Sequence, residues 1–194
     1  DNATIATRRG GYFELETHAG AAVPQGQDLA QLVISAENGS GAQINIEITG
    51  VGSSGYDVLS EYYGEDQLII FNPSGRSGYT DVYGQHTPAT DKSGQLLMGN
   101  ARAEVWWQMR EVLDPENGRE VALPRNNRLK AGLSAARWKV TTRGIMVEEK
   151  EAIKKRLGYS PDEAEAVIFA NWEPMKPPEV KKPKRYETFS KAMR

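Results

Sequence analysis

The hydrophobic positions of residues 1–71 switch between the two-residue period of strands and the longer period of helices. β-Formers on both sides of Gly10-Gly11 predict a hairpin within residues 1–17. The elements expected after it are a helix over 27–39, a strand over 42–48, a glycine-rich turn over 49–55, a short helix over 56–64 and a strand over 67–71. Strands and helices in this order favour an α/β domain with a partly parallel sheet.

The second half of the chain opens on a long polar stretch. Residues 72–99 are rich in Gly, Ser, Thr, Pro and Asp, which predicts a loop, and loops of this length are often functional. The elements expected after it are helices over 100–113 and 127–136, strands over 138–142 and 145–149 around an Arg143-Gly144 turn, and helices over 149–158 and 157–172.

Two of these helices carry start signals. Asn100 is the expected N-cap of the helix over 100–113, which should turn its apolar side chains inward, namely Trp106, Met109, Val112 and Leu113. Ser160 is the expected N-cap of the last helix, with Pro161 at its first helical position.

The last helix raises a question of chemistry. Its segment "SPDEAEAVIFA" carries three acids in the first turn of a sequence otherwise suited to burial. Asp162 and Glu165 lie three residues apart and therefore share a helix face. Acids at a helix N-terminus need no function, because they interact favourably with the helix dipole by ~0.3–1 kcal/mol. Glu165 is less easily explained in this way, since Ala164, Ala166 and Val167 surround it. Such a pair can chelate a divalent cation if another acid comes near.

Composition narrows the possible chemistry. The 39% hydrophobic and 26% charged residues are typical of a globular domain, and no apolar run approaches the ~18–20 residues that span a bilayer. The absence of cysteine excludes disulfides, thiolate zinc sites and a cysteine nucleophile. His18 and His86 are too few for a histidine-rich metal centre and lie outside any nucleophile elbow. Any metal would therefore be held by oxygen ligands, which suits Mg²⁺ or Mn²⁺.

The charge is unevenly distributed. Residues 173–194 carry a net charge of +4 and four prolines, which leaves a net charge of −6 for residues 1–172. Residues 1–172 are therefore expected to form one domain, followed by a basic, proline-rich tail over 173–194. Such a tail is suited to contact with nucleic acid or an acidic partner, and it is equally typical of a terminus that only aids solubility.

An acid also stands at the end of a strand. Glu47 closes the apolar strand over 42–48, and ligands of open α/β sheets collect at the carboxyl ends of strands. The alternative is an outward-facing residue of a half-exposed strand. The Gly50-x-Gly52 sequence that follows fails as a nucleotide-binding fingerprint, because the third glycine is absent at the required spacing. A tight turn beside a site is the better interpretation.

Three segments together resemble a known family. "INIEITGVGSSGYDVL", "NARAEVWWQMREVL" and "IMVEEKEAIKKRLGYSPDEAEAVIFA" follow one another as in the C-terminal nuclease domain of the large terminase subunits of tailed bacteriophages. The resemblance covers about residues 1–172, and its most specific parts are the Ser-Pro-Asp run and the Asn-x-Arg-Ala-Glu helix. It implies a ribonuclease-H-like α/β fold, a mixed sheet flanked by helices.

The resemblance also implies a function. In that family, acids on two strands and on the last helix hold two divalent metal ions, Mg²⁺ or Mn²⁺, that hydrolyse duplex DNA during genome packaging. The matching residues here are Glu47, where the family more usually has Asp, with Asp162 and Glu165. Lys154, Lys155 and Arg156 are the candidates for binding the DNA backbone, although a solvated helix face is an alternative. The implied partners are double-stranded DNA, the terminase ATPase domain, the small terminase subunit and the portal protein, in the cytoplasm of the host bacterium and without a membrane.

One departure from the family pattern limits the resemblance. The family's first acid lies on a strand that precedes the segment beginning at Asp1, so we expect this chain to be a piece of a longer polypeptide. The sequence leaves three hypotheses for the function. The chain is a metal-dependent DNA endonuclease, a docking module of the packaging motor with an incomplete nuclease site, or another ribonuclease-H-like enzyme such as a resolvase or transposase. The Ser-Pro-Asp and Asn-x-Arg-Ala-Glu segments argue against the third.

Overall fold

The computed structural model describes residues 2–48, 51–118 and 120–177. Strands β1 (Ala3–Arg9) and β2 (Tyr12–His18) form the predicted antiparallel hairpin, with a register that runs from Ala3 opposite His18 to Arg9 opposite Tyr12. Gly10 at the turn has φ +64°, a left-handed conformation that glycine adopts without strain. The hairpin prediction is therefore confirmed.

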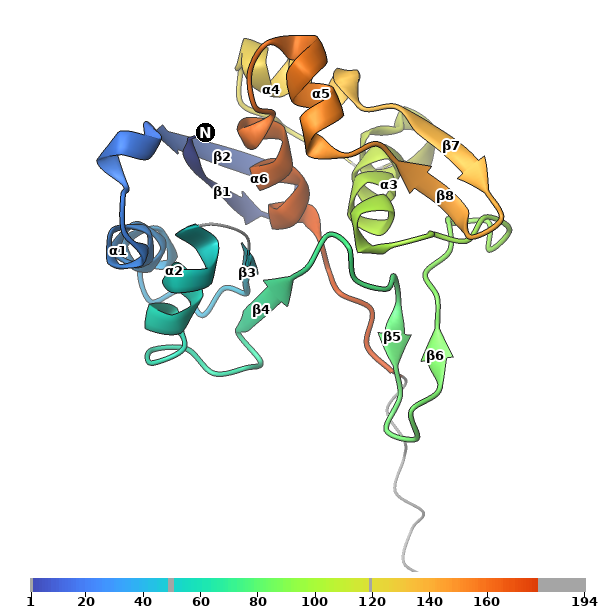
Figure 1. Ribbon diagram of the computed structural model, residues 1–194, viewed down its shortest axis with the longest axis horizontal. Coiled ribbons are helices and arrows are strands. Elements are labelled where there is room, and N and C mark those ends of the chain that lie inside the picture. Colours follow the sequence, from blue (N-terminus) through green and yellow to red (C-terminus); the bar gives the residue numbers. More distant parts are fainter. Residues whose placement is uncertain (1, 49–50, 119, 178–194) are drawn as a thin grey trace, which may run out of the picture.

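A βαβ unit follows the hairpin. Helix α1 (Gly26–Glu37) leads to β3 (Ile44–Glu47), α2 (Val51–Leu59) and β4 (Leu68–Phe71). Strands β3 and β4 are parallel, which confirms the partly parallel arrangement, and α2 lies in the connection between them, as parallel strands require. Helices α1 and α2 lie side by side and cover a small core around Ala30, Ile46, Leu59 and Leu68 (Figure 1).

The glycine-rich turn expected over 49–55 is wrong from residue 51 onward, where α2 begins; Thr49 and Gly50 lie outside the described residues. The glycines allow close packing and do not form a turn. A Cβ on Gly52 would lie 1.9 Å from the carbonyl oxygen of Glu47, and one on Gly55 would lie 2.9 Å from Leu29 of α1. Since helix propensity alone disfavours glycine, the sequence could not indicate a helix here.

The segment over 72–99 is more ordered than a structureless loop. It contains a short antiparallel hairpin of β5 (Tyr79–Thr80) and β6 (His86–Thr87), which projects away from the rest of the fold (Figure 1). Asp81 closes its tip by accepting hydrogen bonds from the backbone N–H groups of Tyr83 and Gln85.

Helices α3 (Ala101–Leu113), α4 (Asn127–Ala135) and α6 (Asp162–Asn171) build the larger core. Asn100 caps α3 as predicted, with its side chain accepting from the N–H of Ala103. The prediction that four α3 side chains face inward is confirmed for Trp106, Met109 and Val112, which are buried. It is wrong for Leu113, which lies at the last turn and is 40% exposed.

A second hairpin and a short helix complete the fold. Strands β7 (Trp138–Thr141) and β8 (Gly144–Val147) are antiparallel, as predicted, and α5 (Lys150–Leu157) follows directly. Two 3₁₀ turns, Gly20–Ala22 and Pro115–Asn117, connect other elements. Ser160 is not the N-cap of α6: Pro161 occupies that position, and the Ser160 hydroxyl donates to Asp162 instead.

The strands of the described residues form four two-stranded sheets, one parallel and three antiparallel. Helix α6 connects the β1–β2 sheet with the β3–β4 sheet, because it packs along β1 and touches β3, and it also contacts α3 and α4 (Figure 1). The first turn of α6 is thus enclosed by elements from both ends of the chain. Among the helices described, none is long and apolar enough to cross a membrane.

Candidate metal centre on the first turn of α6

Asp162 is a buried carboxylate held by three donors. It is only 7% exposed. The Ser160 hydroxyl donates to Oδ1 at 2.5 Å, and the backbone N–H of Asn2, which precedes β1, donates to Oδ2 at 2.9 Å. Lys150 Nζ lies 3.0 Å from Oδ1. Burial raises the pKa of Asp162, but the bonds from Ser160, Asn2 and Lys150 outweigh it, and the pKa lies below its usual range.

Glu165 lies one turn further along the same helix face and is 3% exposed. Its two oxygens have different cationic partners. Arg102 Nη1 lies 2.9 Å from Oε1, whereas Lys150 Nζ lies 2.8 Å from Oε2. The helix spacing that predicted a shared face for Asp162 and Glu165 is confirmed, because both carboxylates reach one ammonium group.

Lys150, the first residue of α5, therefore bridges the two acids. Burial lowers the pKa of an ammonium group, but the neighbouring Glu165 and Asp162 carboxylates raise the pKa of Lys150 above its ordinary value. Lys150 remains charged at neutral pH. Asp162 Oδ1 and Glu165 Oε2 thus converge on one position that carries a positive charge.

Arg102 approaches Glu165 from the opposite side. It lies in the first turn of α3, is 3% exposed, and donates from Nε to the carbonyl oxygen of Glu148 at 2.9 Å. Its guanidinium lies over the ring of Trp106, 5.6 Å from the centroid. Its Nη2 is buried and has no hydrogen-bond partner within the part of the chain that the structure describes. Arg102 therefore fixes the carboxylate of Glu165 and ties α6 to the end of β8.

Lys150 and Arg102 were not among the residues expected at this site. Lys150 lies in a run of charged residues, "EEKEAIKKR", where nothing distinguishes it from its exposed neighbours. Arg102 carries a signal that was available: together with Glu104 it interrupts the apolar α3 segment "ARAEVWW". Charged residues inside such a segment are buried only when they are paired.

The third acid of the turn belongs to another contact. Glu163 is 2% exposed and pairs through Oε1 with Arg128 Nε of α4 at 3.0 Å. The Arg128 guanidinium also lies over the ring of Tyr159, 4.1 Å from its centroid. Glu163 thus packs α6 against α4.

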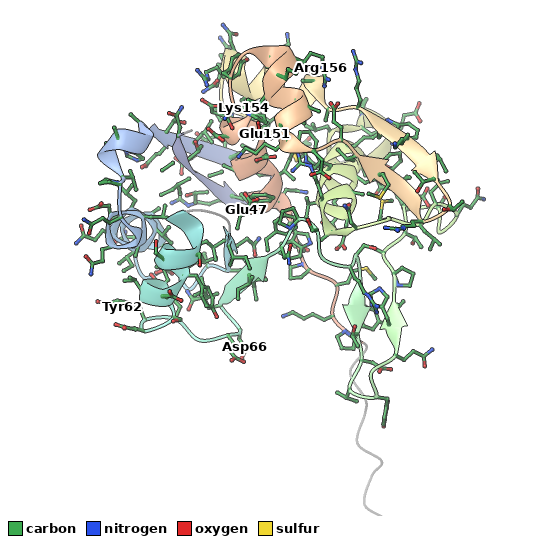
Figure 2. The ribbon with its side chains drawn as sticks, in the orientation of Figure 1. Glu47, Tyr62, Asp66, Glu151, Lys154 and Arg156 are labelled. Carbon is green, nitrogen blue, oxygen red and sulfur yellow. The ribbon has the colours of Figure 1, made fainter. Side chains whose placement is uncertain are left out.

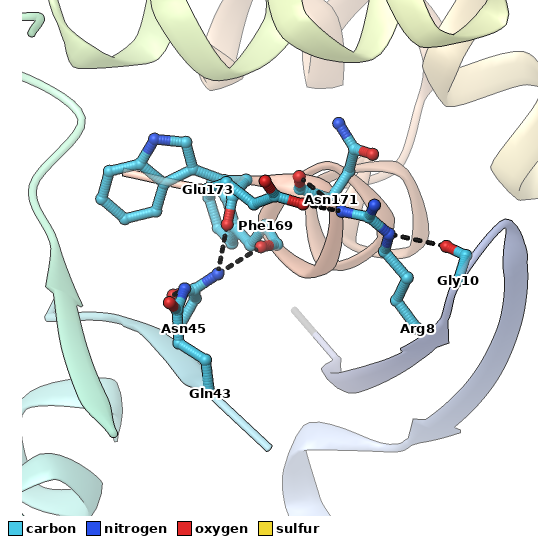
Figure 3. A network of polar contacts seen from close by, with 8 residues as sticks. Arg8, Gly10, Gln43, Asn45, Phe169, Asn171 and Glu173 are labelled. Carbon is cyan, nitrogen blue, oxygen red and sulfur yellow. Dashed lines mark hydrogen bonds and ion pairs between the residues drawn. The ribbon is translucent and has the colours of Figure 1, made fainter. Parts of the chain in front are cut away.

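The far end of α6 is fixed by two side chains. Asn45 of β3 donates from Nδ2 to the carbonyl oxygens of Phe169 and Trp172, at 2.7 and 3.0 Å. Arg8 of β1 donates to the carbonyl oxygen of Asn171 and pairs with Glu173 (Figure 3). These bonds satisfy carbonyl groups that a helix end leaves unpaired, and they set the position of α6 relative to both strands.

Glu47 is the last residue of β3, opposite Phe71 in the parallel register, and is half-buried (Figure 2). The structure places it at the carboxyl end of a parallel strand, as the sequence predicted. Within the described ranges, however, no three or more His, Asp or Glu side chains form a group that could hold a metal ion. The structure brings Asp162 and Glu165 together and does not add Glu47 to them. Its role as a metal ligand stays a prediction.

The three cations proposed for DNA binding on α5 differ from one another. Arg156 forms two hydrogen bonds with the carboxylate of Glu148 and also donates to the carbonyl oxygen of Ala135, so it has a packing role (Figure 2). That contact lowers the pKa of Glu148. Lys154 is half-buried, and Lys155 is exposed. Their contact with DNA stays a prediction.

A comparison with solved structures identifies the fold, whereas two other comparisons find no match. No protein-family model matches the sequence, and no curated protein matches it. Solved structures do. A lysine-to-alanine mutant of the nuclease domain of the large terminase subunit gp2 of bacterial virus Sf6, with manganese, is similar at a TM-score of 0.63 and 19% identity, over 87% of this chain and 82% of that chain. The domain without the mutation is similar at a TM-score of 0.61 and 18% identity, over 87% and 81% of the two chains. The chain therefore has the ribonuclease-H-like α/β fold of that nuclease domain.

Proposed function

We propose that this chain is a metal-dependent endonuclease that cuts double-stranded DNA during phage genome packaging. The observation that supports this proposal best is the pair of buried carboxylates, Asp162 and Glu165, whose oxygens converge on one cationic group. Buried acids are rarely kept without a partner, and this pair is arranged around a single positive charge. The likeness to a nuclease domain that was solved with manganese adds support from the fold.

The donor set suits a hard divalent cation. Mg²⁺ is usually held by one or two carboxylates, with water and substrate phosphate at its remaining positions. Asp162 Oδ1 and Glu165 Oε2 are the two carboxylate oxygens that face the position of Lys150 Nζ and would be offered to a cation there, although Oδ1 also accepts from Ser160. Asp162 Oδ2 and Glu165 Oε1 face Asn2 and Arg102 instead. We assign Glu47 as a further ligand of the same centre, which would hold two Mg²⁺ or Mn²⁺ ions.

When bound, divalent cations lower the pKa of water and stabilise the leaving oxygen of a phosphodiester. Hydrolysis joins the water oxygen to phosphorus and breaks the bond to the 3′ oxygen, which leaves a 5′-phosphate and a 3′-hydroxyl. The chain's own residues prepare the site: the lowered pKa of Asp162 keeps its carboxylate charged, and Arg102 fixes which oxygen of Glu165 faces the centre. Lys150 holds the acids together and must yield its position to a bound cation.

The proposed partners follow from the proposed function. They are double-stranded DNA, the terminase ATPase domain, the small terminase subunit and the portal protein, in the cytoplasm of the host bacterium. Lys154 and Lys155 on α5 are proposed contacts to the DNA backbone. We give Arg156 a smaller part, because its guanidinium is already engaged by Glu148 and Ala135.

Cleavage of supercoiled plasmid in Mn²⁺ tests the proposal. The variants Asp162→Asn and Glu165→Gln remove one metal-binding charge each, and Glu47→Gln tests the assigned third ligand. Asp66→Asn is the matched control, since Asp66 is exposed and lies outside the centre (Figure 2). We expect cleavage by the parent chain or by a form extended upstream of Asp1. We also expect all three site variants to lose cleavage and the control to cleave like the parent chain. Cleavage that survives Asp162→Asn would remove the proposal.

A docking module with an incomplete nuclease site is the second candidate. It is favoured by one observation: within the described residues no group of three acids is placed so that it could hold a metal ion, and Glu47 does not join Asp162 and Glu165. In that case the form extended upstream of Asp1 would bind DNA but would not cut it in the presence of Mg²⁺ or of Mn²⁺. Cutting by the extended form would exclude the docking function as the sole activity.

A further inference from the structure

A shallow hollow of about 510 Å³ lies along the β7–β8 hairpin, outside the acid pair of α6. Its lining includes three cations, which are Arg137 ahead of β7, Lys139 within it and Arg143 at the turn. All three side chains are exposed. Strand β7 pairs only with β8 in the described residues, so one side of the hairpin is an open edge.

The charge of this hollow is positive and mostly uncompensated. Lys139 and Arg143 contribute only backbone groups to the hydrogen bonds of the described chain. Two acids also line the hollow, Glu148 and Glu149. Glu148 pairs with Arg156 and also interacts with the nearby charge of Arg137. The uncompensated positive charge therefore comes mainly from Lys139 and Arg143, with Glu149 as the remaining acid of the lining. An extended positive surface of this kind attracts polyanions rather than a single small anion.

An aromatic residue, Trp138, also borders the hollow, but its side chain lies on the other face of β7 from Lys139, because successive side chains of a strand alternate. Trp138 is 50% exposed, yet its ring is held edge-on against Trp107, with ring centroids 5.1 Å apart and planes at 89°. Arg110 covers the Trp107 ring at 4.6 Å, so the stack beneath Trp138 is supported from α3. The contact of Trp138 with Trp107 anchors β7, the strand that carries Lys139, to α3.

The hollow is connected directly to the acid pair. Glu148 and Glu149 line it, and the next residue, Lys150, bridges Asp162 and Glu165. Arg102 holds this connection in place by donating to the carbonyl oxygen of Glu148 while it pairs with Glu165. A ligand bound along β7–β8 would therefore lie next to the segment Glu148–Lys150, which contacts the acid pair directly.

We propose that the β7–β8 hollow binds the phosphate backbone of duplex DNA through Arg137, Lys139 and Arg143. The proposal rests on the proposed endonuclease function and names the surface that would carry its substrate. The contacts are to phosphates, so binding is independent of base sequence and sensitive to salt.

Fluorescence anisotropy with a labelled duplex, in EDTA and over a series of NaCl concentrations, tests the proposal without cleavage. The test variant is Lys139→Ala with Arg143→Ala. The matched control is Arg125→Ala with Lys130→Ala, which removes one arginine and one lysine from exposed positions elsewhere. Circular dichroism of each protein reports whether it is folded.

We expect the test variant to bind about ten-fold or more weakly near 0.1 M salt, and its slope of log affinity against log salt to fall by about two. The control should keep the parent slope. Equal losses in both variants, or no loss in the test variant, would overturn the proposal. Because no metal is present, these outcomes are separate from the plasmid test: a chain that binds through the hollow but never cuts contradicts only the endonuclease function.

Discussion

Lys150 Nζ lies 2.8 Å from Glu165 Oε2 and 3.0 Å from Asp162 Oδ1, so one ammonium group serves two buried carboxylates. Arg102 supplies a second cation to Glu165 only. Charges balance across this group, although each acid by itself would be costly to bury. The same geometry explains how an apolar helix retains acids on its first turn.

Removal of the ammonium group should strengthen cation binding. In Lys150→Ala, Asp162 and Glu165 keep their positions through Asn2, Ser160 and Arg102 but lose the charge between them. We expect Mn²⁺ to bind about ten-fold more tightly, the equivalent of ~1.4 kcal/mol. Titration calorimetry measures the affinity, and Lys130→Ala, an exposed cation on α4, is the control. An unchanged Mn²⁺ affinity would show that the position between the acids is not a cation site.

Loss of the Arg102 guanidinium should destabilise the fold strongly. Arg102→Gln leaves a buried Glu165 oxygen without its cation, and breaking a buried pair typically costs about 3–5 kcal/mol. Urea denaturation measures the free energy of unfolding. The double variant with Glu165→Gln should lose less than the sum of the two single variants, because the residues are in contact. Additive losses would mean that the pair does not interact as the geometry indicates.

Glu104 should make stability depend on pH. Burial raises the pKa of Glu104, although the backbone N–H of Gly78 at 2.7 Å and Trp172 Nε1 at 3.3 Å stabilise its charged form. A raised pKa means that the folded state holds the proton more tightly than the unfolded state. Stability therefore falls as pH rises from the ordinary glutamate value through the raised one. The free energy of unfolding of Glu104→Gln should lack this fall, so the parent should weaken relative to the variant as pH rises. Parallel pH profiles would contradict this.

Asp162 should have the opposite effect. Its pKa is lowered in the fold, so its contribution is fully present above the ordinary aspartate pKa of about 4 and is lost as pH falls through the folded value. We expect the parent to lose its stability advantage over Asp162→Asn on acidification. The comparison requires unfolding curves of both proteins across the acidic range. A constant difference between the two stability curves across this range would contradict the prediction.

Gly52→Ala should destabilise the chain even though alanine is the better helix former. An added Cβ would lie 1.9 Å from the carbonyl oxygen of Glu47, a backbone atom that cannot rotate away. We expect a loss of about 1–3 kcal/mol in the free energy of unfolding, against the gain of roughly 1 kcal/mol that helix propensity alone predicts. Gly64→Ala is the control, since its Cβ would meet no atom within 4 Å. A stabilised Gly52→Ala would refute the close approach of α2 to β3.

The sequence by itself determined the local elements and the shared helix face. The hairpins at Gly10 and Gly144, the parallel strands, the Asn100 cap and the spacing of Asp162 and Glu165 all follow from periodicity and turn chemistry, which act over a few residues. The helical start of α2 was missed because its glycines serve contacts with Glu47 and Leu29, which local propensity cannot register.

Only the tertiary structure decided which charges meet. Lys150 and Arg102 lie 12 or more residues from the acids that they contact. Nothing in the neighbourhood of Lys150 separates it from solvated cations such as Lys155, and the apolar neighbours of Arg102 indicate burial but not its partner. Arg156, a candidate for DNA binding, forms hydrogen bonds with Glu148 that the sequence did not indicate, and Ser160 supports Asp162 rather than capping α6. The physical reason is that an ion pair depends on distance in space and on burial, and both are set by how α3, α5 and α6 pack together.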